Sequence, residues 1–246
     1  MSSFFDYIKF SDKKGDGGKS DFPPSPFFLR GQIAIIRTML ELLFLPVLFF
    51  SVIVHEVAHG YAALRLGDDT ALHLGRLTLN PGPHIDPVGT ILLPLFLFIT
   101  NAGFLIGWAK PVPVNPYNFV NPRQDFAKVG AAGPLSNVAL AILSAMMLTI
   151  LNLSGLMRSF SLVAELLQYS VFINILLAIF NLIPIPPLDG SRILSAMLPA
   201  ETAYKYDRMM RFGPFLTLII IWMFWPFIFT IVRTIEGAIL TVALSI

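Results

Sequence analysis

Two histidines and a glutamate stand inside a long apolar stretch of the sequence. His55 and His59 are four residues apart, with Glu56 between them, in the apolar run 40–66. On a helix, residues at this spacing share one face, so both imidazoles can reach a single metal ion. In the pattern H-E-x-x-H the two histidines bind zinc and the glutamate acts on a water molecule. The spacing therefore predicts a hydrolytic metal site.

The alternative interpretation is that these histidines are hydrogen-bonded residues of an ordinary core. The run 40–66 is long enough to cross a bilayer, because about 20 residues at about 1.5 Å per residue suffice. A charged side chain costs roughly 2.5–3.5 kcal/mol in the middle of such a helix. Three ionisable groups with metal-ligand spacing in this setting favour a bound ion.

The composition is that of a membrane protein. Hydrophobic residues make up 55% of the 246 residues and charged residues only 13%, which leaves little polar surface for a soluble domain. We expect an all-α polytopic membrane protein, a helical bundle of about four to six transmembrane segments in contact with the lipid bilayer. The net charge of +2 and the scattered basic residues argue against nucleic acid as a partner.

The sequence contains no cysteine, which excludes a disulfide scaffold and a thiolate zinc site. Histidine and carboxylate are then the plausible ligands of a zinc ion. The domain organisation follows from a change of composition. We expect residues 1–29, rich in Lys, Gly, Ser and Pro, to form a disordered polar tail that is no signal peptide. Residues 30–246 are expected to form one membrane-embedded domain.

Four further apolar segments follow the histidine motif, at residues 88–108, 133–153, 162–185 and 212–246. Pro94 and the sequence Asn101-Ala102-Gly103 interrupt the first, so it is expected to be a re-entrant or broken element covered by protein or water. The second is expected to be a helix that starts near Gly133. The last forms one helix or two, divided at Trp225-Pro226.

The loops contain two other histidines. His73 and His84 lie in the loop 67–86, and either could serve as a third metal ligand. We favour local hydrogen bonding for both, because a carboxylate later in the chain is the stronger candidate. The loop 109–127 is rich in proline and asparagine and is expected to be extended and irregular.

Three asparagines interrupt the apolar segments. Small residues surround Asn137, so it could form an interhelical hydrogen bond or contact a substrate, and both roles are left open. Asn174 and Asn181 are seven residues apart, which places them on one face of a helix, directed to the interior.

A proline-rich break precedes one acidic residue. Pro184, Pro186 and Pro187 must end the helix that contains Asn181. Asp189 is then either the N-cap of a short helix or the third zinc ligand, since catalytic zinc takes three protein ligands. Both roles are filled if Ser191 provides the cap.

Three motifs in this order resemble the site-2 protease family of intramembrane zinc metalloproteases. They are HEVAH at 55–59, GPLSN at 133–137 and NLIPIPPLDG at 181–190. The strings GRLTLNP at 75–81 and GWAKPVPVNP at 107–116 are similar to the short prokaryotic members without a PDZ or CBS domain. The resemblance covers residues 40–215.

The resemblance implies His55, His59 and Asp189 as ligands of one Zn²⁺ ion, and Glu56 as the catalytic general acid/base. Asn137 and Asn181 would help to bind the substrate, a transmembrane segment of another protein. Zinc-activated water would then hydrolyse a peptide bond in a locally unwound stretch of that segment. The extended region 101–107 is expected to pair with the unwound strand.

The three ligands also predict a topology. They require the end of the first helix, the start of the helix with Asn137 and the break before Asp189 to share one side of the membrane. The resemblance implies the cytoplasmic side of a prokaryotic plasma membrane. One set of basic residues agrees with the positive-inside rule: Lys110, Arg123, Lys128, Arg192, Lys205, Arg208 and Arg211. Another set would lie outside: Lys9, Lys13, Lys14, Lys19, Arg30 and Arg37.

A function from a different class uses the same residues. A zinc or other divalent-metal transporter also holds histidines and carboxylates within the membrane. Such folds often consist of related halves with several successive sites. This sequence has one compact set of ligands and a general base, which favours the protease. The oligomeric state is not predictable from the sequence.

Overall fold

The computed structural model describes residues 26–100, 107–208 and 213–245. The chain divides into two units, residues 1–40 and 41–246. The first unit contributes the beginning of helix α1 (Pro26–Arg65), and the second contains all the other helices. The described residues contain helices and loops and no strand, in agreement with the predicted all-α class. Residues 1–25 of the predicted polar tail lie outside the described residues, so the tail stays a prediction.

Four helices among the described residues are long and apolar enough to cross a membrane. They are α1, α4 (Pro122–Leu153), α5 (Ser161–Asn181) and α8 (Gly213–Ser245), with candidate spans at Leu43–Arg65, Pro122–Leu153, Ser161–Asn181 and Met223–Ser245. The chain is therefore a multi-pass membrane protein, as its composition predicts.

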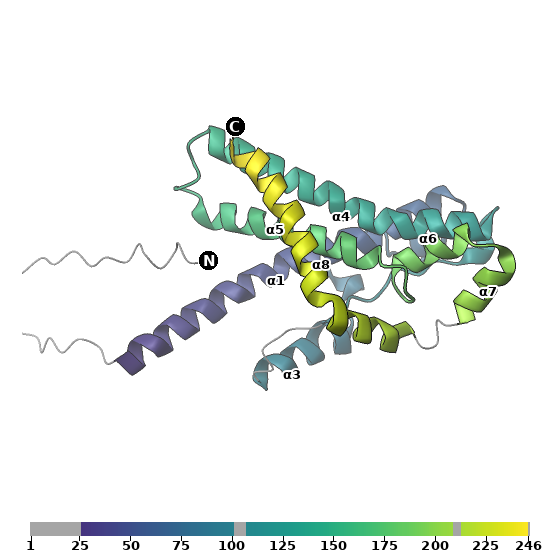
Figure 1. Ribbon diagram of the computed structural model, residues 1–246, viewed down its shortest axis with the longest axis horizontal. Helices are drawn as coiled ribbons and strands as arrows, with labels where there is room; N and C mark the ends of the chain where they lie inside the picture. Colours follow the sequence, from purple (N-terminus) through teal and green to yellow (C-terminus); the bar gives the residue numbers. More distant parts are fainter. Residues whose placement is uncertain (1–25, 101–106, 209–212, 246) are drawn as a thin grey trace, which may run out of the picture. The chain divides into compact units, whose positions relative to one another are not determined.

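Helices α4, α5 and α8 pack around one apolar core (Figure 1). The buried residues include Ala141, Ala145 and Leu148 of α4, Val171 of α5 and Val232 of α8. Small alanine side chains let the helix backbones approach closely, which is how helices associate in a bilayer. Large apolar side chains on the outer faces are exposed and are suited to contact lipid.

The described helices directly after the first loop are too short for a membrane span. Helices η3 (Pro87–Leu92) and α3 (Leu93–Ile99) together are only about 20 Å long at about 1.5 Å per residue, whereas a span needs about 30 Å. The chain then returns to its starting point, because Trp108 N–H donates to the Gly89 carbonyl at 3.1 Å. The Thr90 hydroxyl donates to the Trp108 carbonyl at 2.8 Å. These contacts support the predicted re-entrant element.

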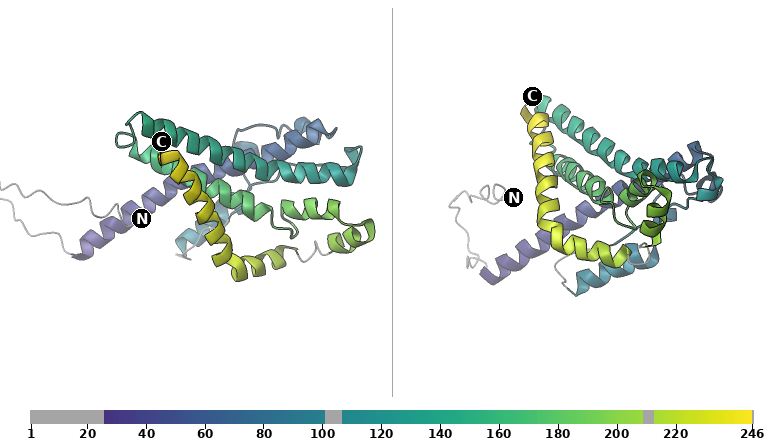
Figure 2. Two further views of the ribbon diagram at one scale, coloured as in Figure 1. Left: turned by 45° about the horizontal axis from the view of Figure 1, so that its top comes forward. Right: turned by 45° about the vertical axis from the view of Figure 1, so that its right-hand side comes forward.

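One helix boundary differs from the sequence-based prediction, and one alternative that the sequence left open is decided. Helix α4 begins at Pro122, not near Gly133, so Pro134 lies in its interior. The overlooked signal is Asn121-Pro122, because proline is favoured at the first position of a helix. Neighbouring helices in a membrane also make an interior proline tolerable. Helix α8 is undivided although it contains Pro226, and Figure 2 shows that it bends.

Short elements connect the spans. Between α1 and η3 lie α2 (Thr70–His73) and η2 (Gly82–His84), and η4 (Pro116–Asn118) precedes α4. Helices α6 (Asp189–Met197) and α7 (Ala200–Arg208) lie between α5 and α8. In Figures 1 and 2, α6 and α7 lie near one end of α4, while the C-terminal end of α8 lies near the other end. At that other end the Asn152 amide donates to the Leu244 carbonyl at 3.3 Å.

Candidate metal centre

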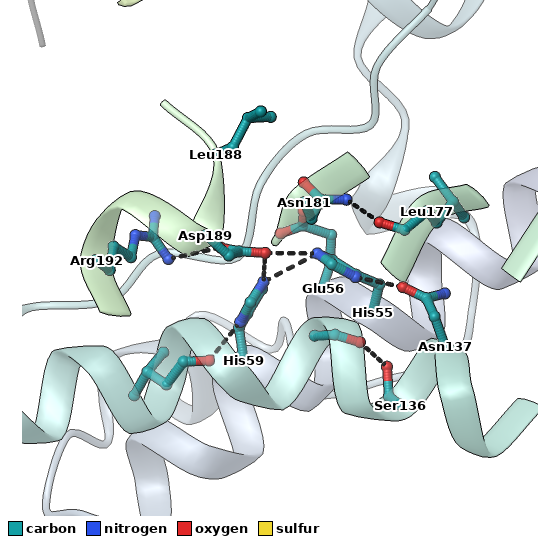
Figure 3. Close-up of polar contacts among 12 residues, drawn as sticks. His55, Glu56, His59, Ser136, Asn137, Leu177, Asn181, Leu188, Asp189 and Arg192 are labelled. Carbon is teal, nitrogen blue, oxygen red and sulfur yellow. Dashed lines mark hydrogen bonds and ion pairs between the residues drawn. The ribbon is translucent and has the colours of Figure 1, made fainter. Parts of the chain in front are cut away.

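Three buried side chains from two distant parts of the sequence converge on one point (Figure 3). His55 Nε2 and His59 Nε2 lie 3.1 Å apart. Asp189 Oδ2 is 3.1 Å from His55 Nε2 and 3.2 Å from His59 Nε2. Ligands bound to zinc at about 2.0–2.1 Å in a tetrahedron are about 3.3–3.4 Å apart. The triangle therefore has nearly the size that one zinc ion requires.

The partners of the other ring nitrogens decide which species these three atoms can bind. His55 Nδ1 lies 2.6 Å from Asn137 Oδ1, and His59 Nδ1 lies 2.7 Å from the Val129 carbonyl oxygen. Both partners are acceptors, so each Nδ1 carries the proton and each neutral ring presents a lone pair at Nε2. Two such lone pairs and a carboxylate oxygen facing one another need a cation between them. The donor set thus fits a metal ion.

Asp189 reaches the histidines because the chain breaks sharply before it. Helix α5 ends at Asn181, as the prolines predict, and α6 begins at Asp189 with Leu188 as its N-cap residue. Gly190 permits this turn, since a Cβ there would collide with the backbone of Leu182. Because Leu188 is the N-cap residue, with no side-chain cap hydrogen bond, Asp189 is not the N-cap and its carboxylate points at the imidazoles. Ser191 does not provide the cap either, because its hydroxyl donates to the Leu188 carbonyl at 2.6 Å.

Arg192 steadies the same carboxylate from outside. Its Nη1 lies 3.3 Å from Asp189 Oδ1, the oxygen that faces away from the histidines. The guanidinium also lies 4.6 Å from the centre of the Phe126 ring. Asp189 Oδ2 therefore remains available to bind a metal ion between the two histidines.

Helix α4 approaches the centre at a glycine. A Cβ built on Gly133 would lie 2.5 Å from His59 Nε2 and 2.6 Å from His55 Cε1. Real Cβ atoms essentially never come so close to other heavy atoms. The absence of a side chain at Gly133 therefore lets α4 bring Val129 and Asn137 within hydrogen-bonding distance of the two rings.

Glu56 is held by a backbone group of the extended segment that follows the re-entrant element. Its Oε2 accepts a hydrogen bond from Val112 N–H at 2.9 Å. Gly60, one turn further along α1, has no Cβ that would collide with the Val112 side chain. The proline-rich sequence predicts an extended loop here, but nothing in it indicates a contact with Glu56.

The extended segment is fixed on both sides of Val112. Lys110 N–H donates to the His84 carbonyl at 2.8 Å, and Arg76 Nη2 donates to the Lys110 carbonyl at 2.8 Å. Asn115 N–H donates to Asp68 Oδ2 at 2.7 Å. Residues 101–106, most of the stretch expected to pair with substrate, lie outside the described residues.

The remaining predicted residues occupy different places. Asn137 is fully buried and bonded to His55, which is the interhelical one of its two possible roles. Asn181 is half-buried, and its amide nitrogen donates to the Leu177 carbonyl of its own helix at 2.9 Å. His73 pairs with Asp69 on the surface, and His84 donates to the Thr78 carbonyl at 2.9 Å. Neither loop histidine belongs to the His-His-Asp cluster.

The sequence analysis assigns no role at the site to four of its neighbours: Val112, Val129, Gly133 and Arg192. Two of them act through backbone atoms, which leave no trace in residue type. Gly133 had a usable signal, because a glycine on the helix face that carries Asn137 indicates a close approach.

Comparisons with known proteins point to zinc metalloproteases. The model of peptidase family M50 matches residues 157–223. YwhC of Bacillus subtilis, provisionally named a zinc metalloprotease, is 39% identical over 188 residues, which cover 73% of this chain and 82% of YwhC. Rip2 of Mycolicibacterium smegmatis, named in the same way, is 33% identical over 157 residues, or 62% of this chain and 56% of Rip2. No solved structure matches the chain.

Proposed function

Because the chain belongs to peptidase family M50, whose members are intramembrane zinc metalloproteases, we propose that it cleaves other membrane proteins within or near their transmembrane segments. One observation carries the proposal: two imidazole nitrogens and a carboxylate oxygen meet beside Glu56 at a membrane-spanning helix. His55, His59 and Asp189 would hold one Zn²⁺ ion.

The residues around the centre divide the work. A bound zinc ion would act as a Lewis acid that lowers the pKa of a water molecule and polarises a peptide carbonyl. Glu56 takes a proton from that water and returns it to the leaving amine, as a general acid/base does. Asn137 orients His55. Asn181, half-buried at the end of α5, is available for substrate binding.

Substrate access sets a further condition. A transmembrane helix keeps its carbonyl groups in internal hydrogen bonds, so the scissile stretch must unwind before hydrolysis.

We place the centre toward the cytoplasmic side of a prokaryotic cell membrane, since most basic residues of the connecting segments lie at that end.

The test compares purified Glu56→Gln with wild-type protein in liposomes that contain a model transmembrane substrate. Glu56→Gln keeps the acceptor for Val112 N–H and should retain zinc, but it should lose cleavage by a factor of about 10² or more, because the general base is gone. Glu201→Gln is the matched control: Glu201 is exposed on α7, and its replacement should leave both quantities unchanged.

The same liposomes test the transporter. Zinc flux that persists in Glu56→Gln, together with no cleavage by the wild-type protein, would refute the protease and favour transport.

A further inference from the structure

A chain of polar side chains leads from the candidate metal centre into the apolar bundle. Asn137 of α4, Asn174 of α5 and Ser51 of α1 are all buried, the two asparagines completely. They are joined by hydrogen bonds of 2.8 and 2.9 Å, and the chain ends at His55. Buried polar groups in a membrane are costly, so an uninterrupted set that joins three spans calls for an explanation.

The hydrogen bonds have one direction, and it is set by a backbone carbonyl. The Ser51 hydroxyl donates to the Val47 carbonyl of its own helix at 2.8 Å, so its oxygen can only accept from Asn174. Asn174 Nδ2 donates to Ser51 Oγ at 2.9 Å and also to the Ser170 carbonyl at 2.9 Å. With its nitrogen held by two acceptors, the Asn174 amide must turn its oxygen to the opposite side.

That oxygen fixes the next amide in the same way. Asn174 Oδ1 accepts from Asn137 Nδ2 at 2.8 Å, and Asn137 therefore presents Oδ1 to His55 Nδ1 at 2.6 Å. Only a protonated Nδ1 can bond to this oxygen, so the lone pair of His55 lies at Nε2, where Asp189 and His59 converge.

We propose that Asn174 is a positioning residue that, through Asn137, selects the metal-binding tautomer of His55. The proposal rests on the metal centre of the proposed function. If the Asn137 amide were reversed, its nitrogen would face His55 and would favour a proton on Nε2, which blocks the ligand position. Both amides are fully buried and bonded to each other, so the orientation of each depends on the next.

The ordinary alternative is that Asn174 only joins helices. If Asn174 only joins helices, its replacement should lower the stability of the fold. If it selects the tautomer of His55, its replacement should lower the zinc affinity even in a variant that is as stable as the wild type. The polar cluster contains a control for this difference: Ser144 Oγ bonds to Ser170 Oγ at 2.8 Å and links α4 to α5. Ser170 also accepts hydrogen bonds from Asn174 Nδ2, but Ser144 itself bonds to neither Asn174 nor Asn137. Ser144→Ala should therefore weaken helix packing without changing the affinity for zinc.

The test measures zinc affinity by competition with a chelator, for purified full-length variants whose folding is checked by thermal unfolding. Asn174→Leu removes the acceptor for Asn137 and should weaken zinc binding about tenfold, the lower end of the range for residues behind a ligand. The effect is limited because Asn137 Nδ2 also lies 3.4 Å from the Ser51 carbonyl. Asn174→Asp, protonated in the apolar bundle so that one oxygen donates to the Ser170 carbonyl and the other accepts from Asn137, should restore most of the affinity.

A second readout is the tautomer itself. The chain has only four histidines, so ¹⁵N-histidine NMR of the metal-free protein can follow each ring. The His55 signal should show a proton on Nδ1 in the wild type and a shift toward Nε2 in Asn174→Leu. If that variant does not fold, Ser51→Ala interrupts the same chain with a smaller change and should act in the same direction.

Two outcomes separate the hypotheses. If the wild type binds zinc tightly and the affinities of Asn174→Leu and Ser51→Ala both stay within twofold of it, the positioning role is overturned. The metal centre is then left intact. Stoichiometric zinc binding that survives His55→Ala overturns the metal centre and the positioning role with it.

Discussion

At the scale of single residues, the candidate metal centre depends as much on an absent side chain as on its ligands. Gly133 is where α4 passes the two imidazoles, and it lets Val129 and Asn137 fix both Nδ1 atoms. The ligand residues alone would not define which nitrogens face the ion, because a neutral histidine has two tautomers.

The first prediction concerns this glycine. Gly133→Ala should push α4 away from His59 and His55 and lower zinc affinity by a factor of about 10 to 100, as loss of supporting contacts does. Chelator competition measures the change. The control is Gly237→Ala in α8, where a Cβ would meet no atom within 4 Å, and it should leave affinity unchanged. Equal affinities of the two variants would contradict the close approach of α4.

At the scale of elements, the segment after the re-entrant helices brings a backbone donor to Glu56. The extended conformation around Val112 is held by Arg76 and by the His84 carbonyl, both from the loop that follows α1. The segment that follows the re-entrant element therefore orients the proposed general base.

The second prediction removes that donor. Val112→Pro eliminates the N–H that Glu56 accepts, and an extended backbone tolerates proline. We expect kcat for a model substrate to fall about tenfold or more with zinc content unchanged, because the base loses its orientation. Val112→Ala keeps the N–H and should retain most of the activity. A similar loss in both variants would attribute the effect to side-chain packing.

The third prediction concerns the anchor of the same segment. Asp68 is buried after α1 and accepts hydrogen bonds from Thr70, Asn115 and Asn118. Burial raises the pKa of this carboxyl, but the hydrogen bonds outweigh burial and the pKa lies below its ordinary value. The charged form is thus favoured by folding, and its contribution is complete above about pH 4 and lost as the pH falls through the lower folded pKa.

We therefore expect acid to lower the thermal stability of the wild type more than that of Asp68→Asn, which should already be less stable at pH 7. Thermal unfolding in detergent between pH 7 and pH 3 measures both effects. Asp69→Asn is the matched control, since its side chain is 57% exposed and it should follow the wild type. Parallel acid sensitivity of Asp68→Asn and wild type would exclude Asp68 as the anchor.

At the scale of the whole molecule, the arrangement of helices in the second unit brings the ends of several candidate spans to the metal centre. The end of α1, the beginning of α4 and the break after α5 meet at the metal centre. Helices α4 and α5 are joined by a short turn at the opposite end. The ends of the re-entrant element lie together, since Trp108 N–H bonds to the Gly89 carbonyl, and we therefore expect α1 to end and α4 to begin on the same side of the membrane.

The fourth prediction concerns this topology. The chain has no cysteine, so single cysteines can be introduced without removing native ones. Asp69→Cys, Lys110→Cys and Lys205→Cys should react with an impermeant thiol reagent from one side of sealed vesicles, and Ser154→Cys only from the other. Labelling of Asp69→Cys and Lys110→Cys from opposite sides would show that residues 87–108 cross the membrane.

Much of this architecture is predictable from the sequence, for physical reasons. Apolar length sets which segments can span a bilayer, and the prolines at 184, 186 and 187 have to end α5. Helix boundaries are less well determined. The local sequence around Pro134 favours a helix start, because proline is common there. The helix packing that lets Pro134 lie inside α4 is not visible in the local sequence.

By itself, the sequence determined the membrane class, the histidine pair beside Glu56 and the candidate aspartate, because spacing along one helix and apolar length are local properties. Only the tertiary structure decided that Val112 N–H meets Glu56, that Gly133 lies against the imidazoles and that Asn174 is linked to His55. These contacts join residues far apart in the chain, and several use backbone atoms, so residue type could not reveal them. Only the packing of helices and loops in three dimensions brings such groups to hydrogen-bonding distance.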